Sequence, residues 1–472
     1  MAQERMTQER MAQECELPNL RHLRVFQAVA RLGGISGASR EARLSQPAVT
    51  QAIAKLEALL DAVLFERRQS GCFLTEYGRT YLARTNRMFT EMEEGLVAPL
   101  VGPPFVDDKS LRSMLAKITA THVRALMAVA ERRSIETAAL KLGISAPSLT
   151  RAARDLEAVL RRTLFHSGLQ GLTPTKPATE LARRFGLACR ELTYANDEIA
   201  TIKGMSTSRV IIGTLPLFPV SLIARSVDDL LRIYPGTRVL VLEGAYLALL
   251  DDLRAGKIDF LVSVLRRPSW AEDVHEEPLF RDPYAIVARR EHPLFYRKNI
   301  TLQDLADFEW VLPELGTPRR TAFEHMFKDF NPKPRASVET RSIEFQRGML
   351  AMSDRISIVT RQETILEERI GVLAALPFAP PVSRNADGIA TRANWKPTIV
   401  QLAFLDLLRR NARENLPTWQ SILEVSGSHR VTTRGEPAPS VTGPAGNSER
   451  RVRGGGVRRR YETILSDTSD HA

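Results

Sequence analysis

Apolar residues recur with a helical period near the start of the chain. Residues 23–30 place leucine, phenylalanine, valine and alanine on one face of a helix, and Gly33 would end that helix. Ser36 can cap a short second helix. Ser45 can cap a third helix, because Pro47 follows in its first turn and an apolar face continues to residue 60. Three short helices in this succession predict a helix-turn-helix.

The pattern changes to the two-residue period of β-strands over residues 66–75, which predicts a short wing after the third helix. The whole succession then returns one hundred residues later. Residues 22–66 and 122–166 align without a gap, and more than a third of the paired positions are identical. The repeat predicts two α-rich winged helix-turn-helix domains, which we place at residues 19–78 and 116–176.

Longer helical stretches follow both copies. We expect linker helices at residues 79–97 and 177–205, each with an apolar stripe through which it could pair, and a connector at residues 98–115. Residues 1–18 are expected to form a flexible leader. Residues 426–472 are rich in glycine, serine, proline and arginine, and we expect a disordered tail there.

Strands and helices alternate from Arg209 onward, which predicts an α/β domain of parallel-sheet type over residues 206–425, large enough for two lobes. In open α/β folds, ligands bind outside the carboxyl ends of the strands, and two lobes add a cleft between them. Loops at these strand ends offer hydroxyl groups and arginines for a carboxylate ligand, although loop capping and surface arginines explain them equally well. The candidate effector-binding residues are Thr214, Leu215, Pro216, Ser263, Val264, Gly316, Thr317, Arg319, Arg341, Thr360 and Arg361.

The third helix of the first copy carries side chains suited to reading DNA. Such a helix fits the major groove, where the amides of Gln46 and Gln51 can pair with adenine, and Pro47 and Ala48 can contact a thymine methyl group. Thr50 can reach a base or a phosphate. Other hydroxyl and basic side chains could position the domain on the backbone. These further candidates are Ser36, Ser45, Lys55, Arg67 and Arg68.

The second copy has a weaker set of such residues. Ala146 stands where the first copy has Gln46, and its wing contains no lysine or arginine before Lys176. Basic residues remain on its third helix, and its candidate DNA contacts are Thr150, Arg151 and Arg154. Two interpretations stay open: this copy contacts DNA, or it is a structural copy that has kept its core and lost its reading residues.

Composition supports a polyanionic partner and argues against several other classes. The 472 residues carry a net charge of +11, so nucleic acid is the first candidate. Three widely spaced cysteines indicate neither a zinc site nor a disulfide framework, so we expect no metal and no cofactor. The sequence has no long apolar run, no signal peptide and no hydrolase or nucleotide-binding motif. We therefore expect a cytoplasmic protein that is not an enzyme.

Several spaced motifs resemble a known family. The first copy resembles the DNA-binding domain of LysR-type transcription regulators, and residues 209–413 resemble that family's effector-binding domain. The motifs of the first copy are His22-Leu23-Arg24-x-Phe26, Leu44-Ser45-Gln46-Pro47-Ala48-Val49-Thr50, Leu64-Phe65-Glu66-Arg67 and Leu74-Thr75-Glu76-x-Gly78. Those of the later region include Tyr234-Pro235-Gly236, Leu253-x-x-Gly256-x-x-Asp259 and His292-Pro293-Leu294.

The resemblance implies a bacterial, sequence-specific DNA-binding regulator controlled by a small metabolite. Its effector-binding domain would have the two-lobed fold of periplasmic binding proteins, with the inducer cleft lined by the loops named above. The family forms homodimers or homotetramers, and RNA polymerase is a further candidate partner. The doubled head departs from the family pattern, so the linker helices could pair within one chain or between chains. The alternative function is a small-molecule-binding protein whose winged heads serve assembly.

Overall fold

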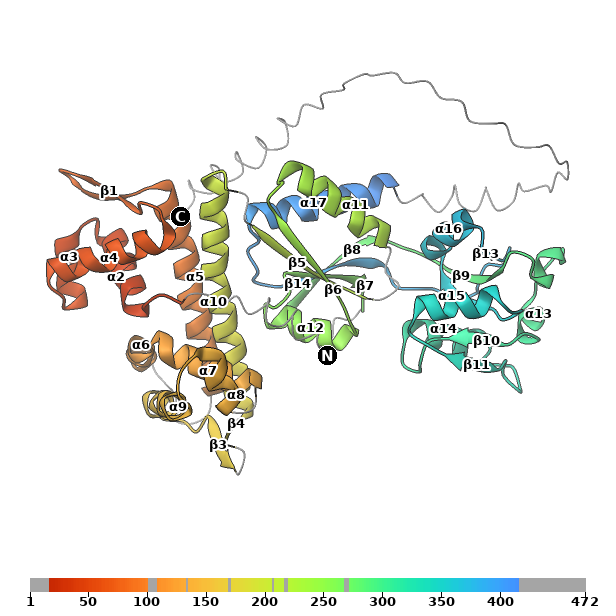
Figure 1. Cartoon of the computed structure of the whole chain (residues 1–472), viewed down its shortest axis with the longest axis horizontal. Helices are drawn as coiled ribbons and strands as arrows, with labels where there is room; N and C mark the ends of the chain where they lie inside the picture. The colour runs from red at the N-terminus through yellow and green to blue at the C-terminus, as the bar shows by residue number, and fades with distance from the viewer. Residues whose placement is uncertain are drawn as a thin grey trace, which may run out of the picture. The chain divides into compact units, whose positions relative to one another are not determined.

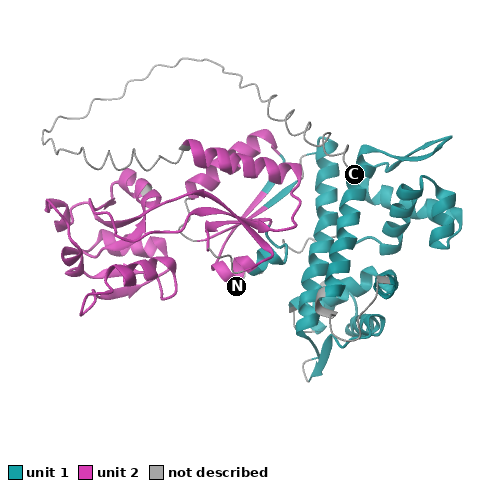
Figure 2. Cartoon of the chain, turned by 180° about the vertical axis from the view of Figure 1, so that it is seen from behind, with its two compact units in different colours: residues 1–210, 236–238, 251–258 teal, residues 211–235, 239–250, 259–472 magenta. Residues whose placement is uncertain are grey.

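The computed structural model describes residues 17–100, 108–132, 135–168, 171–205, 208–215, 220–266 and 271–415. The chain divides into two compact units (Figure 2): residues 1–210 with 236–238 and 251–258, and the remainder. The expected disordered tail, nearly all of the leader and Pro216 lie outside the described residues, so these expectations stay predictions.

The first repeat forms three helices and a hairpin, and we call it the first head. Gly33 ends α2 in a left-handed conformation, and the Ser45 hydroxyl accepts a hydrogen bond from the backbone N–H of Ala48 at the start of α4. The capping role expected of Ser36 is wrong. Gly34, whose backbone is extended, precedes α3, so the helix begins one residue before Ser36. The elements are α2 (Leu20–Leu32), α3 (Ile35–Ala42), α4 (Gln46–Leu60), β1 (Phe65–Arg68) and β2 (Gly71–Leu74).

The second repeat folds in the same way, and we call it the second head. Ser145 caps α9 as Ser45 caps α4, and the two hairpins share an antiparallel register in which Phe65 pairs with Leu74 and Phe165 with Pro174. The gapless repeat therefore corresponds to equivalent elements. They are α7 (Ala120–Arg132), α8 (Ile135–Leu142), α9 (Ala146–Leu160), β3 (Phe165–Gly168) and β4 (Gly171–Pro174).

A long helix follows each head, and the two helices lie side by side (Figure 1). They are α5 (Glu76–Leu100) and α10 (Lys176–Ile202). Their apolar stripes join the cores of both heads into one hydrophobic cluster. The buried members of these stripes include Tyr81, Met88, Phe89, Met92, Leu96, Leu181, Phe185, Leu192 and Ile199.

The expected connector at residues 98–115 contains helix at both of its described ends. The helix α5 continues to Leu100, and α6 (Asp108–Lys117) occupies the second part of the segment. Leu115 is buried, and Leu111 and Met114 pack against the shared core, so this short helix is held by an apolar face. Arg24 of the first head donates hydrogen bonds to carbonyl groups at its C-terminal end.

The later part of the chain builds a five-stranded sheet in the order β6-β5-β7-β14-β8. The expected parallel pairing is found between β5 and β7, whereas β14 runs antiparallel to both β7 and β8, so the sheet is mixed. The helices α11 and α17 pack together. The elements are β5 (Arg209–Thr214), α11 (Val220–Ile233), β6 (Arg238–Glu243), α12 (Tyr246–Arg254), β7 (Phe260–Val264), β8 (Val274–Phe280), β14 (Asp387–Arg392) and α17 (Ile399–Asn415).

A second group of strands lies within residues 284–375. The strand β9 pairs antiparallel with β12 and β13, β10 pairs parallel with β11, and a bridge between Trp310 and Ile356 joins these pairs. Trp310 is fully buried against Phe323 and Phe327. The elements are β9 (Tyr284–Arg289), α13 (Leu302–Ala306), β10 (Trp310–Leu312), α14 (Pro318–Met326), β11 (Ala336–Glu339), α15 (Ile343–Ala351), β12 (Ser357–Thr360), α16 (Arg361–Ile370) and β13 (Leu373–Ala375).

Candidate nucleic-acid interface and effector site

The helix α4 presents a polar face at its N-terminal end. Gln46, Pro47, Gln51 and Lys55 are exposed, and Ala48 and Thr50 are half-buried, while the opposite face of the helix is buried in the head. Within the described residues, the structure records no hydrogen bond or ion pair that occupies either glutamine amide. Both amides are therefore available to hydrogen-bond the edges of bases.

The wing of the first head adds exposed cations next to this helix. Arg67 and Arg68 lie on β1, and both are exposed. A 2.7 Å ion pair holds Arg68 to Glu66, and its guanidinium lies 5.4 Å from the centroid of the Phe73 ring. No ion pair of Arg67 is recorded among the described residues. Ser36 is exposed in the first turn of α3, and Ser45 caps α4.

A glutamate supports the wing in the same way in both heads. The Oε1 atom of Glu57 accepts hydrogen bonds from the backbone N–H groups of Leu64 (2.8 Å) and Phe65 (3.4 Å). Glu157 accepts the equivalent bonds from Leu164 (2.7 Å) and Phe165 (2.9 Å). In both heads, the third helix is therefore tied to the start of the wing by the same interaction.

The candidate DNA contacts of the second head are partly engaged within the head itself. Arg154 donates hydrogen bonds to Glu157 (2.6 Å) and to the Ser167 hydroxyl (2.6 Å), and the Thr150 hydroxyl donates to the carbonyl of Ala146 (2.9 Å). Burial opposes the charge of Glu157, but bonds from Arg154 and the wing backbone lower its pKa. Arg151 is exposed. Of the three expected residues, Arg151 is the one whose side chain has no hydrogen bond or ion pair recorded among the described residues.

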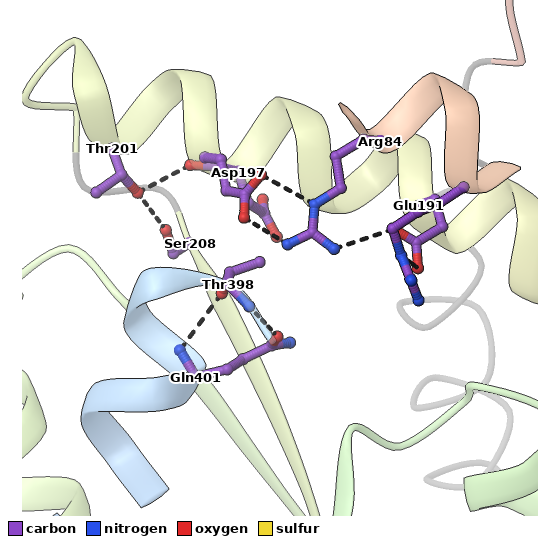
Figure 3. Close-up of polar contacts among 9 residues, drawn as sticks. Arg84, Glu191, Asp197, Thr201, Ser208, Thr398 and Gln401 are labelled. Atoms are coloured by element: carbon purple, nitrogen blue, oxygen red, sulfur yellow. Dashed lines mark hydrogen bonds and ion pairs between the residues drawn. The ribbon is translucent and has the colours of Figure 1, made fainter. Parts of the chain in front are cut away.

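Buried ion pairs join the two long helices. Arg84 of α5 donates to Glu191 of α10 at 3.0 Å (Figure 3) and is also ion-paired with Glu198. Its side chain is 6% exposed, as is that of Glu191. Although burial opposes the charge, hydrogen bonds and attraction from both glutamates raise the pKa of Arg84 above its usual range. The arginine is therefore charged at any physiological pH.

A second set of ion pairs is the symmetry equivalent of the first, with its arginine on α10 and its glutamates on α5. Arg184 of α10 donates to Glu91 of α5 at 3.2 Å and to Glu94 at 3.0 Å. Arg84 and Arg184 occupy equivalent places in the repeats, as do Glu91 and Glu191. Each early arginine reaches a late glutamate on the other helix, so the helices run antiparallel and are related by an approximate two-fold axis. Such reciprocal contacts are typical of a symmetric dimer interface, and here both partners belong to one chain.

Close packing accompanies these ion pairs. A Cβ atom added at Gly95 would lie 2.8 Å from the Cβ atom of Arg184, so only glycine fits where α5 passes α10 at this point. At the other end of the pair, the Lys203 ammonium contacts the C-terminal end of α4. It donates to the carbonyl of Leu60 at 3.1 Å and lies 3.2 Å from the Asp61 carboxylate. The C-terminal end of α10 is thereby fixed to the recognition helix of the first head.

The expected effector residues on the five-stranded sheet lie at the ends of buried strands. Thr214 ends β5, and Ser263 and Val264 end β7; all three are buried, and Leu215 is half-buried. The Ser263 hydroxyl donates to the carbonyl of Val264 at 3.3 Å. Pro216 lies outside the described residues. These positions lie at the carboxyl ends of the strands, where open α/β folds bind ligands.

The expected residues within the second group of strands, residues 284–375, are largely engaged with neighbouring side chains. Thr317 caps α14 and donates to the carbonyl of Glu314 at 3.0 Å, after Gly316 in a left-handed conformation. Arg341 forms an exposed ion pair with Glu314. The others also have partners: Arg319 is ion-paired with Glu363, Thr360 donates its backbone N–H to Glu363, and Arg361 binds Glu368 at 2.6 Å.

A buried charged cluster next to these loops was missed from the sequence. Arg384 is ion-paired with Asp387 and donates to the carbonyl of Asp282, and all three groups are at least nine-tenths buried. Burial raises the pKa of Asp282 to about 6, although Thr360, Arg384 and the backbone of Gln362 oppose the shift. Burial also raises the pKa of Asp387. The cluster could not be found from the sequence because its residues lie far apart along the chain. A single charged residue in a loop usually indicates a position at the protein surface.

Comparisons with known proteins agree on one family. The sequence model described as "Bacterial regulatory helix-turn-helix protein, lysR family" matches residues 20–79 and again residues 120–179. The model described as "LysR substrate binding domain" matches residues 203–413. The HTH-type transcriptional regulator GalR of Pseudomonas putida is 30% identical over 398 residues, which span 84% of this chain and 98% of that protein.

The chain belongs to the LysR family of transcriptional regulators. Another family member, PcaQ of Agrobacterium fabrum, is 25% identical over 299 residues, or 63% of this chain and 96% of that protein. Among solved structures, a full-length OxyR variant of Pseudomonas aeruginosa is 21% identical with a TM-score of 0.45, covering 61% of this chain and 97% of that one. The alignment with GalR is longer than the alignment with PcaQ by almost one hundred residues, which is the spacing of the two repeats.

Membership in the LysR family implies two partners for this regulator, DNA and a small-molecule ligand. The helix-turn-helix model matches the chain twice, once in each head. The relatives named above are transcriptional regulators. Within the described residues, no helix has the length and apolarity to cross a membrane, and no group of acidic, histidine or cysteine side chains could hold a metal ion.

Proposed function

We propose that this LysR-type regulator reads a specific DNA sequence through its first winged head and that a small carboxylate-bearing metabolite controls its activity. The observation that carries the proposal is the exposed N-terminal face of α4, where Gln46 and Gln51 have unoccupied amides. Exposed Arg67 and Lys55 flank this face and can bind phosphates. The protein would act in the cytoplasm, where its operator lies.

We further propose that the two winged heads act as a pseudo-dimer within one chain. The reciprocal pairs Arg84–Glu191, which is buried, and Arg184–Glu91, which is half-buried, support this arrangement, since they join helices that each belong to one head. The rival arrangement pairs these helices between chains. Association into homodimers or homotetramers would then use other surfaces, and RNA polymerase remains a candidate partner.

The fragment of residues 1–205 distinguishes intrachain from interchain pairing, because intrachain pairing alone predicts that it sediments as a compact monomer at micromolar concentration. Cleavage of the segment between the heads then tests whether the helix pair holds the two heads together. A site for a specific protease placed within residues 101–107 allows the full chain to be cut after it has folded. We expect the two fragments to sediment together at micromolar concentration, because the buried helix pair holds them. Fragments that separate on cleavage would overturn intrachain pairing.

The polar residues at the strand ends support a carboxylate as the effector group. Thr214 carries a hydroxyl group at the end of β5, Thr317 carries one at the start of α14, and Arg319 lies in the first turn of α14. Hydroxyl and guanidinium groups are typical ligands of a carboxylate. Thr214→Ala or Thr317→Ala should weaken effector binding by about 0.5–1.5 kcal/mol, or about 3 if a charged oxygen accepts the bond.

Gel shifts with the regulator's own upstream DNA, in the presence of candidate organic acids, test the function as a whole. We expect affinity to fall steeply with salt and to change with one class of acid. The two threonine variants should keep their DNA affinity without effector. A protein that binds acids but shows no salt-dependent DNA binding would instead be a small-molecule-binding protein whose heads serve assembly.

A further inference from the structure

The recognition helices of the two heads carry opposite charges at an equivalent exposed position. Lys55 on α4 corresponds to Asp155 on α9, and both are exposed. Ala146 replaces Gln46, and Ala has no group that can hydrogen-bond a base edge. An exposed carboxylate on this face opposes the approach of phosphates, because like charges within a Debye length repel.

Exposed positions on the helix before the turn and on the wing also become less favourable for phosphate binding in the second head. Ser36 of the first head corresponds to exposed Glu136, and exposed Arg40 corresponds to Leu140, whose side chain is 84% exposed. On the hairpin, Arg67 and Arg68 correspond to Ser167 and Gly168. Each of these exchanges removes a cation or a phosphate-binding hydroxyl, or adds an anion, on the surface that the first head offers to DNA.

The other basic residues of α9 and its C-terminal cap do not restore that surface. Arg154 is bound to Glu157 and Ser167, and the Thr150 hydroxyl is bound to the helix backbone. Arg161 is exposed but ends α9, at the opposite end from the residues that would face bases. Arg151 is left as the one exposed cation that this head offers among the three residues expected to contact DNA.

The core of the second head is nonetheless complete. Leu126, Val129, Leu149 and Leu156 are fully buried, and Glu157 supports the wing as Glu57 does. The head also provides α10, the partner of α5 in the buried helix pair. Its fold is therefore preserved for packing, whereas its DNA-facing surface has diverged.

We propose that each chain carries one DNA-reading head, the first, and that the second head is a built-in pairing partner with no productive DNA contact. The operator bound by one chain is then a single half-site rather than a pair of half-sites. This inference rests on the proposed function, in which the first head reads DNA. It assigns Arg67 and Arg151, which are both exposed arginines, opposite roles.

A matched pair of variants of the full chain tests these roles through the salt dependence of binding. Arg67→Ala should make the slope of log affinity against log salt shallower by about 0.9, the value for one lost phosphate contact. Arg151→Ala should leave both slope and affinity unchanged. An Arg151→Ala variant that loses as much slope as Arg67→Ala would overturn the proposal.

Selection from randomised duplexes, combined with a count of chains per complex by native mass spectrometry, provides the second test. We expect one selected motif for each bound chain, whatever the oligomeric state. Two motifs for each bound chain would overturn the single reading head. Selection of no sequence at all would instead contradict the proposed function, so the two failures are distinguishable.

Discussion

Glu57 and Glu157 accept the same backbone hydrogen bonds in the two heads, whereas Lys55 and Asp155, two residues earlier, carry opposite charges. The comparison separates two kinds of position in one small domain. Positions that pack the core, cap a helix or fix the wing are shared between the repeats, since their loss would unfold either head. Positions on the outer face of the recognition helix have diverged, because packing places no demand on them.

The largest difference that we expect between the two repeats is the loss of stability when each of the two symmetry-related arginines is replaced. Arg84→Met leaves Glu191 and Glu198 buried with less compensation, and we expect a loss of about 3–5 kcal/mol in the free energy of unfolding of the helix pair. Arg184→Met should cost less, about 1 kcal/mol, because the Arg184 side chain is 22% exposed and only one of its two partners, Glu91, is well covered, whereas Glu94 is 42% exposed. Hydrogen exchange of the α5 and α10 amides measures both, and equal losses would contradict the difference in burial.

The next effect concerns base reading. Gln46→Ala should cost about 1–3 kcal/mol of DNA-binding free energy at one base pair and relax preference there. The reciprocal variant, Ala146→Gln, should change neither affinity nor preference. Competition binding with duplexes altered one base pair at a time checks both, and a new preference created by Ala146→Gln would show that the second head reaches bases.

Close packing of the long helices gives a third comparison. Gly95→Ala should destabilise the helix pair by about 1–2 kcal/mol, because the clash with Arg184 outweighs the better helix propensity of alanine. Gly186→Ala on α10 is the control, since its added Cβ would meet no atom closer than 3.9 Å. Local hydrogen exchange should show protection reduced by the first variant and unchanged or increased by the second.

The smallest effect is a pH dependence of the second wing. The pKa of Glu157 is lowered in the folded head, so its stabilising contribution is present above its unfolded pKa and is lost as pH falls through the folded pKa. Arg154→Met removes part of this shift, and solvent screening limits the effect to about 1 kcal/mol or less. Exchange of the Leu164 and Phe165 amides between pH 6 and pH 3.5 should respond less steeply in the variant.

The repeat, the helices of both heads and the alternating elements after Arg209 could be predicted from the sequence, because local periodicity and capping determine them. The helix α6 could not be predicted, because its few apolar residues are explained only by the core against which they pack. The antiparallel β14 was missed because DGIATR has neither a long apolar run nor regular alternation. The cluster of Asp282, Arg384 and Asp387 joins residues about a hundred positions apart, which no local pattern indicates.

The antiparallel pairing of α5 with α10 has a consequence for dosage. A head pair assembled from two molecules dissociates on dilution, because its formation depends on concentration. When both helices belong to one polypeptide, the covalent connection between them makes their pairing intramolecular, so that it no longer depends on the concentration of the protein. A cell that holds only a few molecules would therefore contain the pair as fully formed as a cell that holds many. Changes in expression would alter how many operators are occupied, and would leave the integrity of each head pair untouched.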